Sequence, residues 1–144
     1  MKQFLFFVFK IIVVVLIIAI VLDFTYSEAF AVSPKRGKIG FIVNSEPKEY
    51  DVVILGSSRA NNHFVTKMFQ EKGLKAFNFG MQGSKLFESD LVLKLLLERK
   101  NKIKTVLIDV DVTLLSSKKS EATILKFYPF ISSSPVIQNH LKEL

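Results

Sequence analysis

The segment 52–63, which reads Val-Val-Ile-Leu-Gly-Ser-Ser-Arg-Ala-Asn-Asn-His, constrains the fold of this chain more than any other. A run of apolar, mostly β-branched residues ends at Gly56, and a helical pattern begins soon after Ser58. This order is typical of a buried strand in a parallel sheet, because such a strand is covered on both faces. Since open α/β sheets bind ligands at the carboxyl ends of their strands, we expect the Ser58 hydroxyl at a ligand-binding edge.

The same alternation continues along the chain. Short apolar runs over 75–79 and 105–110 predict a second and a third strand. Apolar residues at helical spacing follow the first strand, and a long amphipathic helix with Ser84 as its amino cap follows the second. The order β-α-β-α-β predicts a parallel sheet with right-handed crossovers.

The predicted fold is an α/β domain over 51–144, with a parallel, flavodoxin-like sheet between two layers of helices. A doubly wound sheet usually has five or more strands, and only three are predicted here. We therefore expect an incomplete domain, either a truncated product or one that another chain completes. Residues 24–50 are predicted to form a stalk with one short edge strand over 39–43, and 136–144 a short amphipathic helix.

The amino-terminal region is dominated by an apolar run from Phe4 to Leu22, interrupted only by Lys10. At about 1.5 Å per residue, the run nearly matches a hydrocarbon core of roughly 30 Å. Lys10 lies near one end of the run, where its stem can reach the headgroups. Residues 1–23 are therefore predicted to be a transmembrane anchor. A cleaved signal peptide is the alternative, because Ala29-Phe30-Ala31 has the small-x-small form of a cleavage site.

The charges around this run give mixed signals for topology. Lys2 and Lys10 favour a cytoplasmic amino terminus, whereas Lys35, Arg36 and Lys38 on the far flank oppose it. We expect a single-pass membrane protein with its amino terminus in the cytoplasm and its domain outside.

Composition excludes several classes of site. The chain has no cysteine, which rules out disulfides, thiolate catalysis and cysteine-based zinc sites. Its net charge of +7 comes from scattered lysines without a basic stripe, so we expect no nucleic-acid partner and interpret the surplus as a surface near anionic lipids. Asp109 and Asp111 flank a strand end, but two aspartates are a weak metal signal, and no metal or other cofactor is predicted.

Two glycine-containing elements carry a family resemblance. Gly56-Ser57-Ser58 follows the first predicted strand, and Asn78-Phe79-Gly80-Met81-Gln82-Gly83 follows the second. In this order, and at the carboxyl ends of strands, they resemble the Gly-x-Ser and Asn-x-Gly-x-x-Gly blocks of the SGNH (GDSL-type) hydrolases, particularly membrane-anchored bacterial members. The resemblance covers roughly residues 51–115, the amino-terminal half of such a domain.

The resemblance implies roles for individual residues. Ser58 is the nucleophile, on a tight turn between strand and helix, and the backbone N–H of Gly83 is an oxyanion donor. The alternative for Ser58 is a simple helix cap, and for the glycines a tight turn. The remaining candidate substrate-binding residues are Arg59, His63, Asn78 and Gly80.

The chain also departs from the family pattern. The family's third block supplies an oxyanion-hole asparagine, which is missing here, and Thr113 is a weaker candidate donor. The family's catalytic histidine, in an Asp-x-x-His element, is missing as well, and without a base Ser58 would be a poor nucleophile. His63 and His140 are the two possible substitutes for this base, but surface, capping or structural roles fit both better.

Two main functions follow from this comparison. The first is a membrane-anchored serine esterase or O-acyltransferase that acts on acylated glycans or lipids outside the cytoplasm. The second is a non-catalytic SGNH-fold module that binds or assembles with an envelope protein partner. A nucleotide-binding domain is a distant third, because the Gly-x-Gly-x-x-Gly fingerprint is absent.

Overall fold

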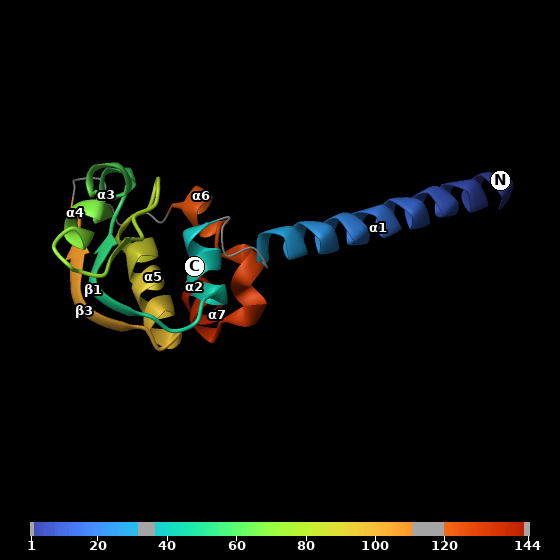
Figure 1. Ribbon diagram of the computed structural model, residues 1–144. Coiled ribbons are helices and arrows are strands. Elements are labelled where there is room, and N and C mark those ends of the chain that lie inside the picture. The colour runs from blue at the N-terminus through green and yellow to red at the C-terminus, as the bar shows by residue number, and fades with distance from the viewer. Residues whose placement is uncertain (1, 32–36, 111–119, 143–144) are drawn as a thin grey trace.

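The computed structural model describes residues 2–31, 37–110 and 120–142. A long helix, α1 (Lys2–Ala31), extends away from a domain built by the rest of the chain (Figure 1). The elements of that domain are α2 (Lys38–Asn44), β1 (Glu49–Leu55), α3 (Ser58–His63), α4 (Thr66–Gln70), β2 (Ala76–Asn78), α5 (Leu86–Glu98), β3 (Lys102–Ile108), α6 (Glu121–Ile124), the 3-10 helix η1 (Tyr128–Ser133) and α7 (Pro135–Lys142).

The three strands form one sheet in the order β2-β1-β3, with both pairings parallel. Val53 of the central strand lies opposite Phe77 on one side and Val106 on the other. All three strands therefore end at the same edge of the sheet. The prediction of a parallel α/β arrangement is confirmed, and each strand lies within a few residues of its predicted place.

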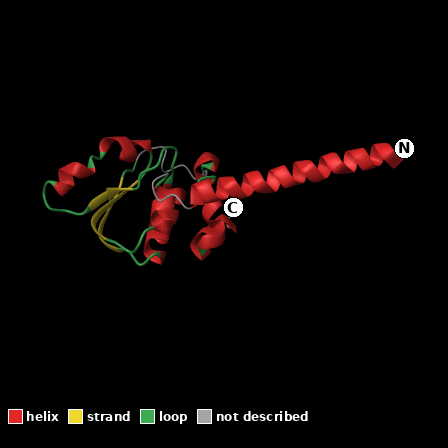
Figure 2. Ribbon diagram, turned by 45° about the vertical axis from the view of Figure 1, so that its right-hand side comes forward, coloured by secondary structure: helices red, strands yellow, loops and turns green. Residues whose placement is uncertain are grey.

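Helices cover both faces of the sheet. Alternate residues of β1 point to opposite faces, so each face of this strand packs in its own cluster. Val53 and Leu55 enter the main core, where α5 packs and where α2, η1 and α7 form the next layer (Figures 1 and 2). Val52 and Ile54 face the other way and pack with Ala60 of α3 and with residues near α4. The apolar face of α5 was predicted correctly and is buried through Leu91, Val92, Leu95 and Leu96.

Two local predictions were wrong. The expected edge strand over 39–43 is helix α2, in which Ile39 and Ile42, three positions apart, bury the same face. The long helix α5 is capped at Lys85 and not at Ser84: the Glu88 carboxylate accepts a hydrogen bond from the Lys85 backbone N–H at 2.7 Å. The helical pattern after β1 divides into α3 and α4.

Helix α1 is longer than the predicted anchor of residues 1–23 and continues into the predicted stalk. Its 30 residues extend about 45 Å, which exceeds the roughly 30 Å of a hydrocarbon core. Residues 2–27 are long and apolar enough to cross a membrane, and a signal sequence would meet the same description. The end of α1 contacts η1, so the helix meets the domain on the side away from the sheet (Figure 1).

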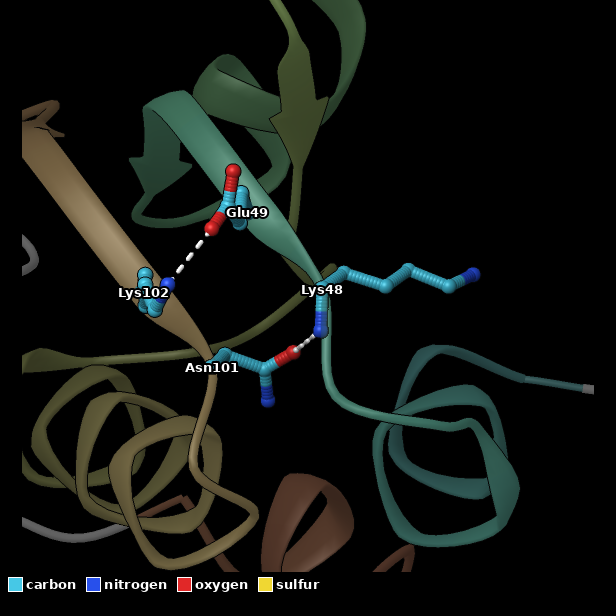
Figure 3. A network of polar contacts seen from close by, with 4 residues as sticks. All are labelled: Lys48, Glu49, Asn101 and Lys102. Carbon is cyan, nitrogen blue, oxygen red and sulfur yellow. Dashed lines mark hydrogen bonds and ion pairs between the residues drawn. The ribbon is translucent and has the colours of Figure 1, made fainter.

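Polar contacts align β1 and β3 at the amino edge of the sheet (Figure 3). The Lys48 backbone N–H donates to Asn101 Oδ1 at 2.9 Å, and Lys102 Nζ lies 2.7 Å from Glu49 Oε1. Both side chains of the ion pair are exposed, so its contribution to stability is small. These contacts accompany the register of the two strands, in which Glu49 lies opposite Lys102 and Leu55 lies opposite Ile108.

Candidate functional site

Ser57 and Ser58 follow the carboxyl end of β1 and occupy different positions relative to helix α3. Ser57 is buried and is the amino cap of α3, and its Oγ accepts a hydrogen bond from the Arg59 N–H at 3.3 Å. Ser58 is the first helical residue and is half-buried. The capping role that the sequence left open for Ser58 therefore belongs to Ser57. The Ser58 hydroxyl, at the edge of the sheet, is therefore not the α3 cap.

Gly56 allows the chain to turn sharply before these serines. Its φ of +139° is a conformation that residues with a side chain rarely adopt. A Cβ at this position would also lie 3.0 Å from the Cβ atoms of both Ala60 and Asp109. The close approach of Asp109 places the end of β3 directly beside the Ser57-Ser58 turn.

Asp109 brings a carboxylate to this edge. Its backbone N–H donates to the Leu55 carbonyl at 3.0 Å, which continues the β1–β3 pairing by one residue. Its Oδ2 atom is buried and has no hydrogen-bond partner among the described residues. A buried carboxylate oxygen without a partner is costly, so Asp109 is a polar group that a ligand or another segment can satisfy.

Asn78 joins the end of β2 to α3. Its Nδ2 donates to the carbonyls of Ala60 at 2.6 Å and Phe64 at 3.1 Å, and its Oδ1 accepts from the Gly80 N–H at 2.9 Å. Gly80 lies so close to α3 that an added Cβ would be 2.7 Å from the Ala60 Cβ. Asn78 and Gly80, both predicted to bind substrate, thus hold the two turns together, and their contact with substrate stays a prediction.

Gly83 has a φ of +77° and faces the start of α6. A Cβ there would lie 3.2 Å from Thr123 Oγ1 and 3.6 Å from Ser120 Oγ. Its role as an oxyanion donor to a group on Ser58 stays a prediction. Thr113 and Asp111, the other candidates in this region, lie outside the described residues.

Neither histidine is placed to activate Ser58. His63 is exposed at the far end of α3, five residues after Ser58, and a helix turns these positions about 140° apart. His140 is buried in α7, where its ring stacks on Phe87 with centroids 3.9 Å apart. Its Nε2 lies 3.2 Å from the Phe87 carbonyl oxygen, so the structure supports a packing role for His140. Arg59 is exposed beside Ser58, and its contact with substrate stays a prediction.

A cavity of about 500 Å³ lies between the end of α1, the start of α2 and the glycine turn after β2. Lys38 lines this cavity, and its Nζ donates to Asn61 Oδ1 at 2.6 Å and to the Gly80 carbonyl. Burial, and then the positive charge of Lys126, lower the pKa of Lys38 to about 8. The cavity therefore adjoins the Ser58 turn through Asn61 and Gly80.

Sequence reasoning missed this cavity because it assigned Lys38 to a stalk. No motif marks Lys38 or Lys126, and the two are brought together only by packing of α2 against the segment after α6. Their like charges in one cavity could not be found from spacing along the chain.

Within the described ranges, no group of three or more His, Cys, Asp or Glu side chains could hold a metal ion. Comparison of the chain with protein-family models, with curated proteins and with solved structures finds no match to any of them.

Proposed function

We propose that this chain is a membrane-anchored, SGNH-like serine esterase or O-acyltransferase that acts on acylated glycans or lipids. In this proposal α1 spans the membrane with its amino terminus in the cytoplasm, and the domain lies outside. The observation that carries the proposal is that Ser57, and not Ser58, caps the helix after β1. Ser57 caps α3, and the half-buried residue Ser58 follows it at the carboxyl edge of the central strand.

The proposed reaction proceeds in two steps. Ser58 Oγ attacks the ester carbonyl, a base takes the hydroxyl proton, and the alcohol leaves with a proton as the acyl-enzyme forms. Water or an acceptor hydroxyl then attacks the acyl-enzyme and releases Ser58. Backbone N–H groups of Ser58 and Gly83 stabilise the oxyanion, with Thr113 as a weaker third donor. The base comes from outside the described residues.

The sheet supports the finer, flavodoxin-like assignment. The order β2-β1-β3 equals the start of the order 2-1-3-4-5 found in flavodoxin-like sheets. In the described part of the chain, β3 pairs only with β1, so its outer edge can accept a further strand. A segment or partner chain that adds strands beside β3 would bring its residues next to Asp109, where a catalytic base is needed.

The test is labelling with a fluorophosphonate probe. The full chain carries an epitope tag in the membranes of its source cell, where any partner is present. We expect the wild type to be labelled and Ser58→Ala to lose the label. Ser132→Ala, which removes an exposed hydroxyl from η1, is the matched control and should label as the wild type does. A folded wild-type protein that takes no label would count against an acyl-transfer role.

The second candidate is a non-catalytic envelope module with the same fold. The positions of His63 and His140 favour it, because neither can serve Ser58 as a base. In this case no label would be found, and crosslinking in the same membranes would capture a protein partner equally well with wild type and Ser58→Ala.

A further inference from the structure

The cavity beside α1 opens at the depth of lipid headgroups if α1 spans the membrane. Tyr26 lines the cavity and follows Leu22, the last residue of the apolar run, by four positions. Four helical residues advance about 6 Å, and the polar layer on each side of a bilayer is about 5–7 Å thick. The rim at Tyr26 therefore lies where headgroups lie, as is common for tyrosine in membrane helices.

Two ammonium groups converge on this cavity. Lys38 donates to Asn61 Oδ1 and to the Gly80 carbonyl, and Lys126 Nζ lies 3.3 Å from the Gln82 carbonyl oxygen. These acceptors are neutral, and among the described residues neither lysine pairs with a carboxylate. Burial first, and the positive charge of Lys126 second, lower the pKa of Lys38, so the two ammonium groups repel each other. An anion between them would relieve both the repulsion and the lack of a counter-charge.

Most of the remaining cavity wall is apolar, although Asn61 and Gln82 also line it. Leu125 and Phe130 lie on either side of Lys126 along the chain, and Ile39 and Met81 lie near Lys38. A volume of about 500 Å³ falls within the usual range for small-molecule sites. An anion alone would leave this apolar wall in contact with water, whereas an amphiphile covers it.

We propose that this cavity binds the phosphate-bearing headgroup of an anionic membrane lipid. Lys38 and Lys126 contact the phosphate, and the first methylenes of the acyl chain pack against Leu125 and Phe130. The proposal rests on the membrane anchoring stated under Proposed function, and it does not depend on catalysis by Ser58.

Photocrosslinking tests the proposal with the full chain in phosphatidylcholine nanodiscs. The probe is phosphatidylglycerol with a photoreactive group near the head end of one acyl chain. We expect crosslinks within residues 125–130, and we expect unlabelled phosphatidylglycerol to compete. Phosphatidylcholine and millimolar inorganic phosphate should not compete. Competition by inorganic phosphate would show a soluble-anion site and overturn the lipid assignment.

Variants distinguish lipid binding in the cavity from a general electrostatic attraction to the membrane. Lys126→Met should lower crosslinking about fivefold, since one lysine near an anionic surface contributes about that factor. Lys126 is exposed, so Lys126→Met should fold. It should do so even if the corresponding change at the half-buried Lys38, Lys38→Met, prevents folding. Lys67→Met, which removes an exposed lysine of α4, is the control and should crosslink as the wild type does. Unchanged crosslinking in Lys126→Met, or crosslinks confined to α1, would refute the proposal.

Ser58→Ala distinguishes this proposal from the proposed enzyme. It should bind the lipid probe like the wild type while it loses the fluorophosphonate label. A wild-type protein that binds the lipid probe but takes no fluorophosphonate label would refute the enzyme alone, and one that takes the label but does not bind the lipid probe would refute the lipid site alone.

Discussion

Lys38 Nζ lies 2.6 Å from Asn61 Oδ1, and this hydrogen bond joins the segment after α1 to the helix that Ser58 begins. Asn61 is three residues after Ser58, and Lys38 also donates to the Gly80 carbonyl in the turn that packs on the same helix. The contact makes the cavity beside α1 and the candidate nucleophile neighbours. A lipid bound at Lys38 would lie beside the turn where an ester would be attacked.

The two adjacent serines should separate stability from activity. Ser57→Ala removes the α3 cap and should lower the free energy of unfolding by about 1 kcal/mol. Ser58→Ala should leave stability nearly unchanged and abolish fluorophosphonate labelling. Chemical denaturation in detergent, combined with labelling, checks both. A larger loss of stability in Ser58→Ala than in Ser57→Ala would reverse the assignment of the cap.

Gly80→Ala should destabilise the site by overpacking. The added Cβ would lie 2.7 Å from the Ala60 Cβ and 2.8 Å from the Asn61 backbone nitrogen, so the turn or α3 must shift. We expect a loss of about 1–3 kcal/mol in the free energy of unfolding. Gly37→Ala is the control, because its φ of 169° is open to any residue and nothing lies within 4 Å of the added Cβ. Equal stability of the two variants would contradict the close packing at Gly80.

The sequence predicted those parts of the fold that follow from local periodicity. The parallel sheet and the buried face of α5 were predictable because continuous apolar runs and helical spacing report burial directly. Helix α2 was missed because a short apolar run such as 39–43 fits a strand and a helix equally well. Only its packing against the main core, through Ile39 and Ile42, selects the helix.

The turns of the candidate site were predictable from the sequence, whereas the convergence of its charged side chains was not. Gly-Ser-Ser after a strand located Ser58 at the sheet edge, but spacing could not decide which serine caps the helix. Lys38 and Lys126 are 88 positions apart in sequence (126 − 38), and their convergence depends on tertiary packing alone. The same holds for the proximity of Asp109 to Gly56, which requires the register of β1 and β3.

Asn78→Ala should loosen the join between β2 and α3. The change removes hydrogen bonds to the Ala60 and Phe64 carbonyls and from the Gly80 N–H. At about 1 kcal/mol for each bond, we expect a loss of about 3 kcal/mol in the free energy of unfolding. Denaturant unfolding measures it, and Asn139→Ala, at an exposed position of α7, is the control. A loss of activity without a loss of stability would instead show that Asn78 contacts the substrate.

Lys38 should make stability depend on pH above 8. Its pKa is lowered from 10.5 to about 8, first by burial and then by the charge of Lys126. Between these two values the unfolded chain holds a proton on this lysine that the folded chain has released, so the free energy of unfolding rises with pH. Lys38→Met lacks this titration. The difference in unfolding free energy, wild type minus variant, should therefore be flat below pH 8 and rise up to about pH 10.5. A difference that stays flat throughout would refute the lowered pKa.

Glu88 is fully buried, and its carboxylate links the start of α5 to the start of α6. Oε2 accepts from the Lys85 N–H at 2.7 Å, and Oε1 accepts from the Ser120 N–H at 2.8 Å. Glu88→Ala leaves both half-buried donors without this acceptor, and at about 1.5–3 kcal/mol for each bond to a charged group we expect a loss of roughly 3–6 kcal/mol.

Asp90→Ala is the matched control for Glu88→Ala on the same helix. Asp90 forms an exposed i,i+4 ion pair with Lys94 at 2.7 Å, a kind of pair worth about 0.3–0.5 kcal/mol. Denaturant unfolding of the two variants should therefore differ by several kcal/mol. Since Ser120 and Thr123 lie beside Gly83, Glu88→Ala should also increase hydrogen exchange at the Gly83 amide, and Asp90→Ala should not. Unchanged exchange at Gly83 in a destabilised Glu88→Ala protein would show that Glu88 does not hold this turn in place.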